Sequence, residues 1–146
     1  MEDFRVSIDD NEITISDVKK WGKELEMDYE SLYEMVSEWD DYQWAVFAYM
    51  DFDPFWITEI HEMELNDNYV ELSNFNLLVA DEYEADNLHL ERCSDYIDDY
   101  IPNFIRKYFD YESFAEDQNR GDMLAGYDGI ENSYRVNGEW IYVYRN

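Results

Sequence analysis

The chain has 146 residues and a formal net charge of −27 at pH 7, because 37 Asp and Glu residues face only 10 Lys and Arg residues. This charge has the wrong sign for direct binding to nucleic acid or to an anionic membrane surface. No apolar run approaches the roughly 18 residues of a membrane-spanning helix, and no segment has the pattern of a signal peptide. Hydrophobic residues make up 46% and aromatic residues 18% of the chain, so it can build a core, and simple acidic disorder is excluded. Cys93 is the single cysteine, which rules out a disulfide within the chain and suits a reducing cytoplasm, where we expect the protein to act.

The first half of the chain is predicted to be mostly helical. Weak alternation of apolar and polar residues indicates short strands at residues 4–8 and 13–15. Helices are expected where apolar residues recur at helical spacing after a capping residue: Ser16 to about Met27, Asp28 to about Trp39, Asp40 or Asp41 to about Met50, and Asp53-Pro54 to about Glu64. The pattern does not decide whether residues 16–39 form one helix or two.

The second half mixes helices and strands. The expected elements, in chain order, are a strand at 69–72, a helix at 74–83, a segment of undecided type at 86–100, a helix at 101–109, and a short helix at 111–118 capped by Asp110. The tail is the clearest strand prediction, because Asn137-Gly138 is a strong hairpin-turn signal between runs of β-branched and aromatic residues.

These elements predict an α+β fold. The N-terminal two-thirds is expected to be mainly helical, and the C-terminal part to contain a helix plus a β-hairpin or small antiparallel sheet. We expect two subdomains, an acidic and mostly helical one over residues 1–94 and an α+β one over residues 95–146.

The acids are concentrated in one region. From Glu24 to Glu91 there are 20 Asp or Glu residues and no Lys or Arg. Like charges four residues apart on a helix cost roughly 0.2–0.5 kcal/mol per pair, and a solvated helix normally avoids this cost by mixing signs. A halophilic surface would spread its acids over the whole chain. The regional bias therefore favours a surface that meets a positively charged partner.

Mimicry of nucleic acid is the function that this pattern favours. B-DNA carries one negative charge per about 1.7 Å of axis, and carboxylates four residues apart on a helix are separated by about 6 Å of rise. A folded acidic surface can thus occupy a basic DNA-binding groove. The candidate phosphate-mimicking acids are Glu26, Glu30, Glu34, Glu38, Asp40, Asp41, Asp51, Asp53, Glu59, Glu62, Asp81, Glu82, Glu84, Asp110, Glu112 and Asp117.

Signatures of enzymatic chemistry are absent or incomplete. The sequence has no nucleophile elbow, P-loop or dinucleotide-binding glycine motif, and no calcium-binding EF-hand loop. His61-Glu62 begins like a zinc-binding motif, but position 65 is Leu. His89 and Cys93 have the spacing of a base and a thiol on one helix, although a buried structural pair explains them better. We expect no catalytic residue, cofactor or metal; an acidic protein–protein adaptor and a small metal-dependent enzyme stay open as alternatives.

Two segments resemble a known family. Residues 108–117, YFDYESFAED, followed by an aromatic hairpin at the end of the chain, resemble the last domain of ArdA antirestriction proteins. Residues 17–50, DVKKWGKELEMDYESLYEMVSEWDDYQWAVFAYM, look like the helical middle domain of the same family. The family's usual N-terminal β-rich domain is expected to be missing, because only about fifteen residues precede the first predicted helix.

The resemblance implies a DNA mimic encoded by a phage or mobile element. ArdA-type proteins are elongated dimers that occupy the DNA-binding groove of type I restriction–modification enzymes, so the resemblance implies a homodimer with such a partner. The shorter chain could also suit an RNA-guided nuclease, which makes an anti-CRISPR protein the alternative. Asp110, Glu112 and Asp117 match acidic positions of the family motif. Its aromatic positions, which we expect to pack internally, are Tyr108, Phe109, Tyr111 and Phe114.

Overall fold

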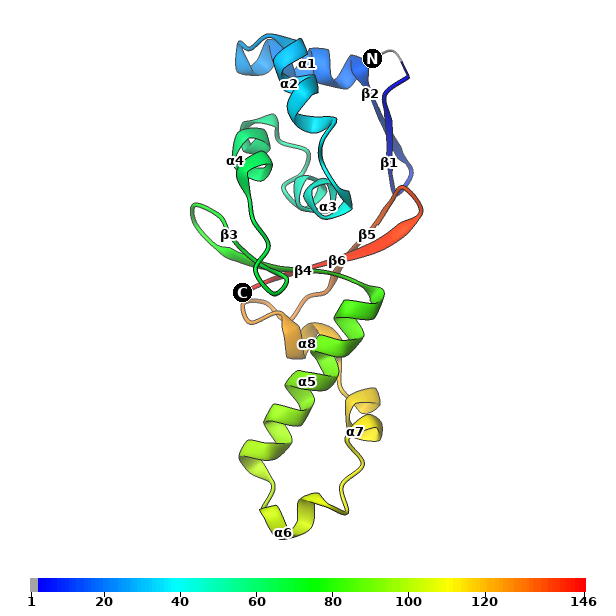
Figure 1. Ribbon diagram of the computed structural model, residues 1–146, viewed down its shortest axis with the longest axis vertical. Helices are drawn as coiled ribbons and strands as arrows, with labels where there is room; N and C mark the ends of the chain where they lie inside the picture. Colours follow the sequence, from blue (N-terminus) through cyan, green and yellow to red (C-terminus); the bar gives the residue numbers. More distant parts are fainter. Residues whose placement is uncertain (1–2) are drawn as a thin grey trace.

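The computed structural model describes residues 3–146, which form a six-stranded antiparallel sheet with helices on both faces (Figure 1). The strands are β1 (Arg5–Ile8), β2 (Asn11–Thr14), β3 (Tyr69–Glu71), β4 (Asn76–Asp81), β5 (Asn132–Val136) and β6 (Glu139–Arg145). Their order in the sheet is β2-β1-β5-β6-β4-β3, and each neighbouring pair is antiparallel. The predicted α+β class is therefore confirmed.

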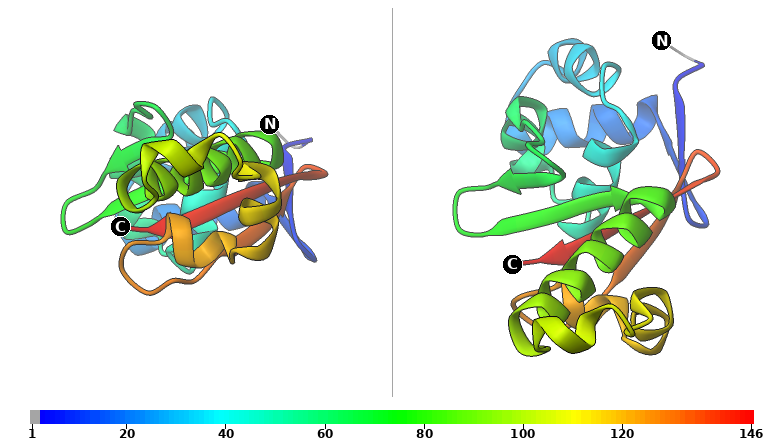
Figure 2. Two further views of the ribbon diagram at one scale, coloured as in Figure 1. Left: turned by 90° about the horizontal axis from the view of Figure 1, so that it is seen from below. Right: turned by 60° about the horizontal axis from the view of Figure 1, so that its bottom comes forward.

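The helices divide into two groups by the sheet face that they cover. One group consists of α1 (Ile15–Leu25), α2 (Tyr29–Val36), α3 (Asp41–Tyr49), the 3-10 helix η1 (Pro54–Trp56) and α4 (Ile57–Glu62). The other consists of α5 (Glu82–Tyr100), α6 (Asn103–Arg106), α7 (Tyr111–Asp117) and α8 (Arg120–Leu124). Figure 1 shows the first group above the sheet and the second below it, and from below α5 to α7 lie in front of the sheet (Figure 2). None of the helices within residues 3–146 combines the length and apolar composition needed to cross a membrane.

The central strands bury side chains on both faces. In β6, Ile141 and Val143 belong to the larger core under α1–α4, whereas Tyr142 and Tyr144 belong to the smaller core beside α5 and α8. Strand β4 alternates in the same way, with Leu77 and Val79 in the larger core and Leu78 in the smaller one. A strand covered on both faces is apolar at every position and therefore loses the period-2 signal of a half-exposed strand.

Two parts of the predicted fold are wrong: the type of the element at residues 74–83 and the extent of the sheet. The first error comes from the lost alternation, and the second from strand pairing between distant parts of the chain. The helix expected at 74–83 is strand β4, whose continuous run NLLVA could not be told from a buried helix by periodicity. The short strands predicted at residues 4–8 and 13–15 are confirmed as β1 and β2, but the sheet is not confined to the C-terminal part as expected. The two strands pair with each other, and β1 pairs with β5. The expected subdomain boundary between residues 94 and 95 falls inside α5, and strands from both sides of it share the sheet.

The predicted capping aspartates are confirmed at four helix starts. The carboxylates of Asp28, Asp40, Asp53 and Asp110 accept backbone N–H bonds at the starts of α2, α3, η1 and α7. A carboxylate at this position satisfies an unpaired N–H group and interacts favourably with the helix dipole. The first helix begins two residues earlier than predicted, after Thr14 rather than Ser16. Residues 16–39 form two helices, because Glu26 ends α1 in the left-handed conformation with φ 55°.

The C-terminal hairpin is confirmed as β5 and β6. Asn137 and Gly138 both have positive φ, 50° and 89°, as a two-residue type I′ turn requires. Asn137 also accepts a hydrogen bond on Oδ1 from the backbone N–H of Ser7, at 3.0 Å, which joins the turn to β1. The hairpin thereby connects the strands of the N-terminus to those of the middle of the chain.

The larger core is predicted to depend on Phe47, which is fully buried on α3. Its ring makes edge contacts with Trp21 and Trp39, at centroid distances of 5.1 and 5.6 Å. Phe47→Ala is expected to lower the free energy of unfolding by about 3–5 kcal/mol, because the cavity cannot close among rigid rings. Phe55→Ala is the control, since Phe55 is 73% exposed, and it should change stability by less than about 0.5 kcal/mol. Urea unfolding of both variants measures the difference; equal effects would contradict this description of the core.

Candidate functional site

The sixteen candidate acids do not share one structural role. Eight of them have carboxylates that form hydrogen bonds or ion pairs with other parts of the chain: Asp40, Asp41, Asp53, Glu59, Asp81, Glu82, Glu84 and Asp110. The other eight, which we call the unbonded acids, have carboxylates without such a bond within residues 3–146: Glu26, Glu30, Glu34, Glu38, Asp51, Glu62, Glu112 and Asp117. All eight unbonded acids are exposed.

The bonded acids mainly stabilise the fold. Asp40, Asp81 and Asp110 cap helices, and the Asp110 carboxylate accepts bonds from both the backbone N–H and the hydroxyl of Ser113, at 3.1 and 2.8 Å. These bonds lower the pKa of Asp110. The sequence predicted the capping role of Asp40 and Asp110 but not that of Asp81, and it still counted all three among the phosphate-mimicking acids.

Tyrosine hydroxyls donate hydrogen bonds to several carboxylates near the sheet. Burial alone would raise the pKa of Glu84, but hydrogen bonds from Tyr42 and Asn68 and from the backbone at Asp81 outweigh it and lower the pKa. A hydrogen bond from Tyr142 likewise lowers the pKa of Glu82 against the effect of burial. A lowered folded-state pKa contributes stability that is complete above the ordinary carboxyl range and is lost as pH falls through the folded-state value.

The predicted column of four glutamates is not continuous. Glu30 and Glu34 lie on α2, whereas Glu26 ends α1 and Glu38 follows the C-cap residue Ser37. All four still lie on the α1–α2 segment at the end of the molecule farthest from α6 (Figure 1). The arrangement is therefore an irregular acidic surface, which we call the α2 acidic face, rather than a regular helical row.

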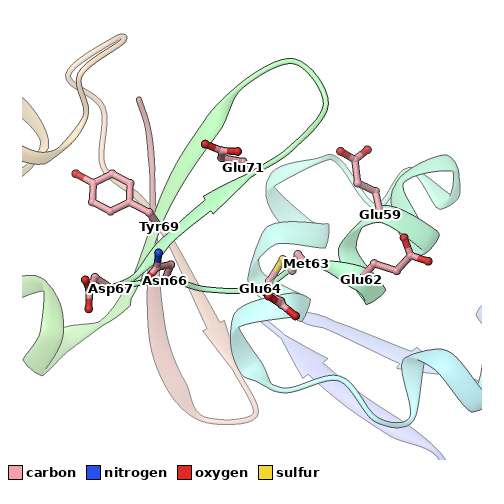
Figure 3. Close-up of a pocket in the computed structure, with 8 residues that line it drawn as sticks. All are labelled: Glu59, Glu62, Met63, Glu64, Asn66, Asp67, Tyr69 and Glu71. Atoms are coloured by element: carbon pink, nitrogen blue, oxygen red, sulfur yellow. The ribbon is translucent and has the colours of Figure 1, made fainter.

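A second concentration of acids surrounds a hollow of about 800 Å³ beside α4 and β3. Glu59 and Glu62 come from α4 and Glu71 from β3, as Figure 3 shows. Glu64 and Asp67 complete the acidic lining. The sequence analysis did not name Glu64, Asp67 or Glu71 as site residues, although all three lie in the acidic block. Within residues 3–146 no group of three or more His, Cys, Asp or Glu side chains is arranged to hold a metal ion.

Very few acids of the block are neutralised. Of the 20 acids between Glu24 and Glu91, only Glu82 and Asp86 form ion pairs within residues 3–146, and both pair with Arg120. Arg120 Nη1 lies 2.9 Å from Glu82 and 2.8 Å from Asp86, and its Nε lies 2.5 Å from Glu131. The Arg120 guanidinium also lies over the Tyr142 ring, 4.4 Å from the centroid. One arginine thus binds three carboxylates at the junction of α5, α8 and the sheet.

The two histidines have structural contacts. His61 Nδ1 accepts a hydrogen bond from the Trp39 indole N–H at 3.2 Å. His89 Nε2 lies 2.7 Å from the Ala115 carbonyl, which ties α5 to α7, and Cys93 Sγ is 4.0 Å from the same ring. Burial raises the pKa of the Cys93 thiol, which disfavours the thiolate that a nucleophile would need.

The four aromatic residues expected to pack internally between positions 108 and 114 differ in their contacts. Phe109 and Phe114 contact each other with ring centroids 5.7 Å apart, and Phe109 also contacts Tyr111 at 6.0 Å, so these three pack as expected. Tyr108 does not pack internally and is 78% exposed, which corrects its expected role. No family model, curated protein or solved structure matches this chain.

The Arg120 cluster is predicted to be the ion-pair group on which stability depends most. Its side chain is only 16% exposed, so Arg120→Gln leaves three carboxylates facing one another and should lower the free energy of unfolding by about 2–3 kcal/mol. Arg5→Gln is the matched control, because the Arg5–Glu12 pair is 69% and 53% exposed and should contribute at most about 1 kcal/mol. Thermal and urea unfolding measure both; a loss for Arg120→Gln no larger than for Arg5→Gln would contradict the prediction.

Alkaline titration is predicted to detect a group of tyrosines that ionise late. Burial is the largest cause that raises the pKa of Tyr42, Tyr49, Tyr142 and Tyr144, and it raises the pKa of Tyr134 to about 12. Because the unfolded-state pKa is about 10, stability should be fully present below pH 10 and decline as pH rises further. The phenolate absorbance of these five residues should therefore appear at higher pH in the native protein than in urea. A native titration curve that coincides with the curve in urea would contradict it.

Proposed function

We propose that this protein is an acidic DNA mimic that inhibits a bacterial defence nuclease by occupying its DNA-binding groove. The observation that carries the proposal is the large number of uncompensated acids on an ordered scaffold: eighteen of the twenty acids in the block from Glu24 to Glu91 lack an ion-pair partner within residues 3–146. Surfaces that serve only as solvated faces gain stability by mixing signs. The missing cations are supplied, in this proposal, by the partner.

The physical basis is the electrostatic term that governs protein–DNA affinity. A groove that neutralises about 6–10 phosphates obtains most of its non-specific affinity from charge, and it responds to any matching negative surface. The α2 acidic face and the acid-lined hollow offer unbonded carboxylates such as Glu30, Glu34 and Glu62 for this purpose. Mutual repulsion in the free protein is relieved in the complex, so the same charges that cost stability contribute to affinity.

The resemblance of residues 108–117 to the ArdA motif favours a type I restriction–modification enzyme as the target. In this proposal Glu112 and Asp117, both exposed on α7, supplement the acids of the block. A Cas effector is the second target that the same physics permits, since its channel is also basic and holds nucleic acid through the backbone. The proposal involves no catalysis and no cofactor.

The test removes the charge of the α2 acidic face without changing its shape. In a variant with Glu26, Glu30, Glu34 and Glu38 all replaced by Gln, stability should hold or rise because repulsion is reduced. Inhibition of DNA binding and cleavage by a type I enzyme should fall roughly tenfold or more, because phosphate-like contacts are lost. Competition with duplex DNA at about 50 to about 200 mM salt measures this loss, because phosphate-like contacts weaken steeply over that range.

A control variant removes equal charge elsewhere. It carries Asp95→Asn, Asp99→Asn, Glu116→Gln and Glu139→Gln, which are exposed acids of α5, α7 and β6 outside the block and without a side-chain bond within the described part of the chain. Inhibition should change much less than in the first variant. Unchanged inhibition by the α2 variant would refute this face as the contact surface, and equal losses in both would mean that net charge alone acts. Little salt dependence of binding would favour the acidic adaptor instead.

A further inference from the structure

The turn between β5 and β6 contains the one asparagine of the chain that a glycine follows. Asn137 and Gly138 are both exposed, and Figure 1 shows the turn beside β1. In such a pair the asparagine side chain can react with the next backbone nitrogen, because glycine has no Cβ to shield that nitrogen. Apart from its chain neighbours, no atom of residues 3–146 would lie within 4 Å of a Cβ added at Gly138, so the turn is not crowded by the rest of the fold.

The hydrogen bonds of the turn suit a reaction between these two residues. The Gly138 backbone N–H forms no hydrogen bond within residues 3–146, so it is free to lose its proton to solvent. Asn137 Oδ1 accepts a hydrogen bond from the Ser7 N–H at 3.0 Å. A donor at this oxygen polarises the side-chain carbonyl and stabilises the negative charge that develops there when a nucleophile attacks. The nucleophile is therefore unbonded, and the electrophile is activated.

The reaction is deamidation, and its only co-reactant is water. The Gly138 nitrogen attacks Asn137 Cγ, a C–N bond forms, and the bond from Cγ to Nδ2 breaks. Ammonia leaves with the proton that the attacking nitrogen gives up, and a succinimide ring remains. Water then opens the ring at either carbonyl, which yields aspartate or isoaspartate at position 137. The net change replaces a neutral amide with a carboxylate and involves no oxidant or reductant.

The Asn137 side chain links the N-terminal hairpin, β1 and β2, to the rest of the molecule. Strands β1 and β5 share a single register pair, Ile8 with Val136. Beside that pair, Asn137 donates its backbone N–H to the Ser7 carbonyl at 2.8 Å, and its Oδ1 accepts from the Ser7 N–H. Its Nδ2 also donates to Asp41 on α3, at 3.4 Å. One exposed side chain thus joins the turn to both β1 and α3.

Deamidation would place two carboxylates against each other. Nδ2 of Asn137, which lies 3.4 Å from an Asp41 oxygen, becomes an oxygen of a charged group, so a donor–acceptor pair becomes a repulsive pair. The side chain must turn away, and the Ser7 N–H then loses its acceptor. The bonds between Asp9 and Arg135 on the other side of the register pair remain, so the hairpin is weakened in its attachment rather than released.

We propose that Asn137 is a site of spontaneous deamidation in the folded protein, and that the product weakens the attachment of the N-terminal hairpin, so that the stability of the protein falls as the molecule ages. This inference goes beyond the proposed function and does not require it. Because the Gly138 nitrogen must lose its proton before it attacks, the reaction should be faster at higher pH.

Peptide mapping tests the reaction itself. Cleavage after arginine gives two peptides with one side-chain amide each: residues 121–135 contain Asn132, and residues 136–145 contain Asn137. In the full chain kept folded at mildly alkaline pH, the second peptide should gain the mass change of a deamidated product while the first stays unchanged. Asn132 is the matched control, because a serine follows it and its Nδ2 donates to the Val143 carbonyl at 3.2 Å within the sheet.

The chain unfolded in urea provides the reference rate. Conversion of Asn137 in the folded protein should be at most about 30-fold slower than in urea, because an exposed turn opens at a small fraction of the global free energy of unfolding. A slower rate in the folded protein, or equal conversion of Asn132 there, would overturn the inference. Because mapping uses the unsubstituted protein, its outcome does not depend on the folding of any variant.

Hydrogen exchange tests the effect on the hairpin. Asn137→Asp reproduces one of the products and should speed exchange of the Ser7 amide at least about fivefold, the effect of one lost hydrogen bond. Asn74→Asp is the control, because Asn74 is exposed between β3 and β4, gains the same charge and has no side-chain bond within residues 3–146. Unchanged exchange in the first variant, or equal acceleration in the control, would overturn the inference.

A charge swap identifies the cause of the weakening. In Asn137→Asp combined with Asp41→Asn, the amide at position 41 can donate to the carboxylate at position 137, so donor and acceptor are exchanged rather than lost. Exchange of the Ser7 amide should return to within about twofold of its original rate. Circular dichroism checks that each variant folds. A double variant that exchanges as fast as Asn137→Asp alone would refute the repulsion from Asp41 as the cause.

Discussion

Strands β4 and β6 lie at the centre of the fold and have side chains buried on both faces, and the other parts of the molecule depend on that arrangement. On one face Ile141 and Val143 pack under α3, and on the other Tyr142 and Tyr144 pack beside α5 and α8. Each buried side chain of this size contributes about 1.5–3 kcal/mol by leaving water. A chain with a net charge of −27 needs such a core, because its surface charges oppose folding rather than assist it.

Acids close to the sheet and acids farther from it have different roles. Close to the sheet, carboxylates are bound by tyrosine hydroxyls and by Arg120, so Glu82, Glu84 and Glu131 act as hydrogen-bond acceptors within the structure. Farther out, on α2 and α4, carboxylates such as Glu34 and Glu62 have no bond within residues 3–146. The fold therefore compensates charge where desolvation would be costly and leaves it uncompensated where a partner can reach it.

The sequence predicted the features that local chemistry determines. Asp28, Asp53 and Asp110 were recognised as caps, and Asn137-Gly138 as a hairpin turn, because each needs only a few neighbouring residues. Strand β4 was predicted as a helix, because a strand covered on both faces has no alternation to detect. The pairing of β1 with β5 joins Ile8 to Val136, a separation in the chain that no local pattern reveals.

The role of each acid was harder to predict than the fold, because carboxylates that look alike in the sequence have different partners in the structure. Asp81 and Asp110 were counted with Glu30 and Glu34, yet the first two cap helices, and the carboxylates of the last two have no bond within residues 3–146. For Tyr108 the error is the opposite one: the sequence analysis predicted an internally packed side chain, and the side chain is exposed. Both errors have one cause: composition reports which groups are present, whereas burial and partners decide whether a group stabilises the fold or remains available for binding. In this chain the exposed acids Glu30 and Glu34 lie on α2 at one end of the molecule, whereas the exposed aromatic Phe104 lies on α6 at the other, and neither group contributes to the two buried cores.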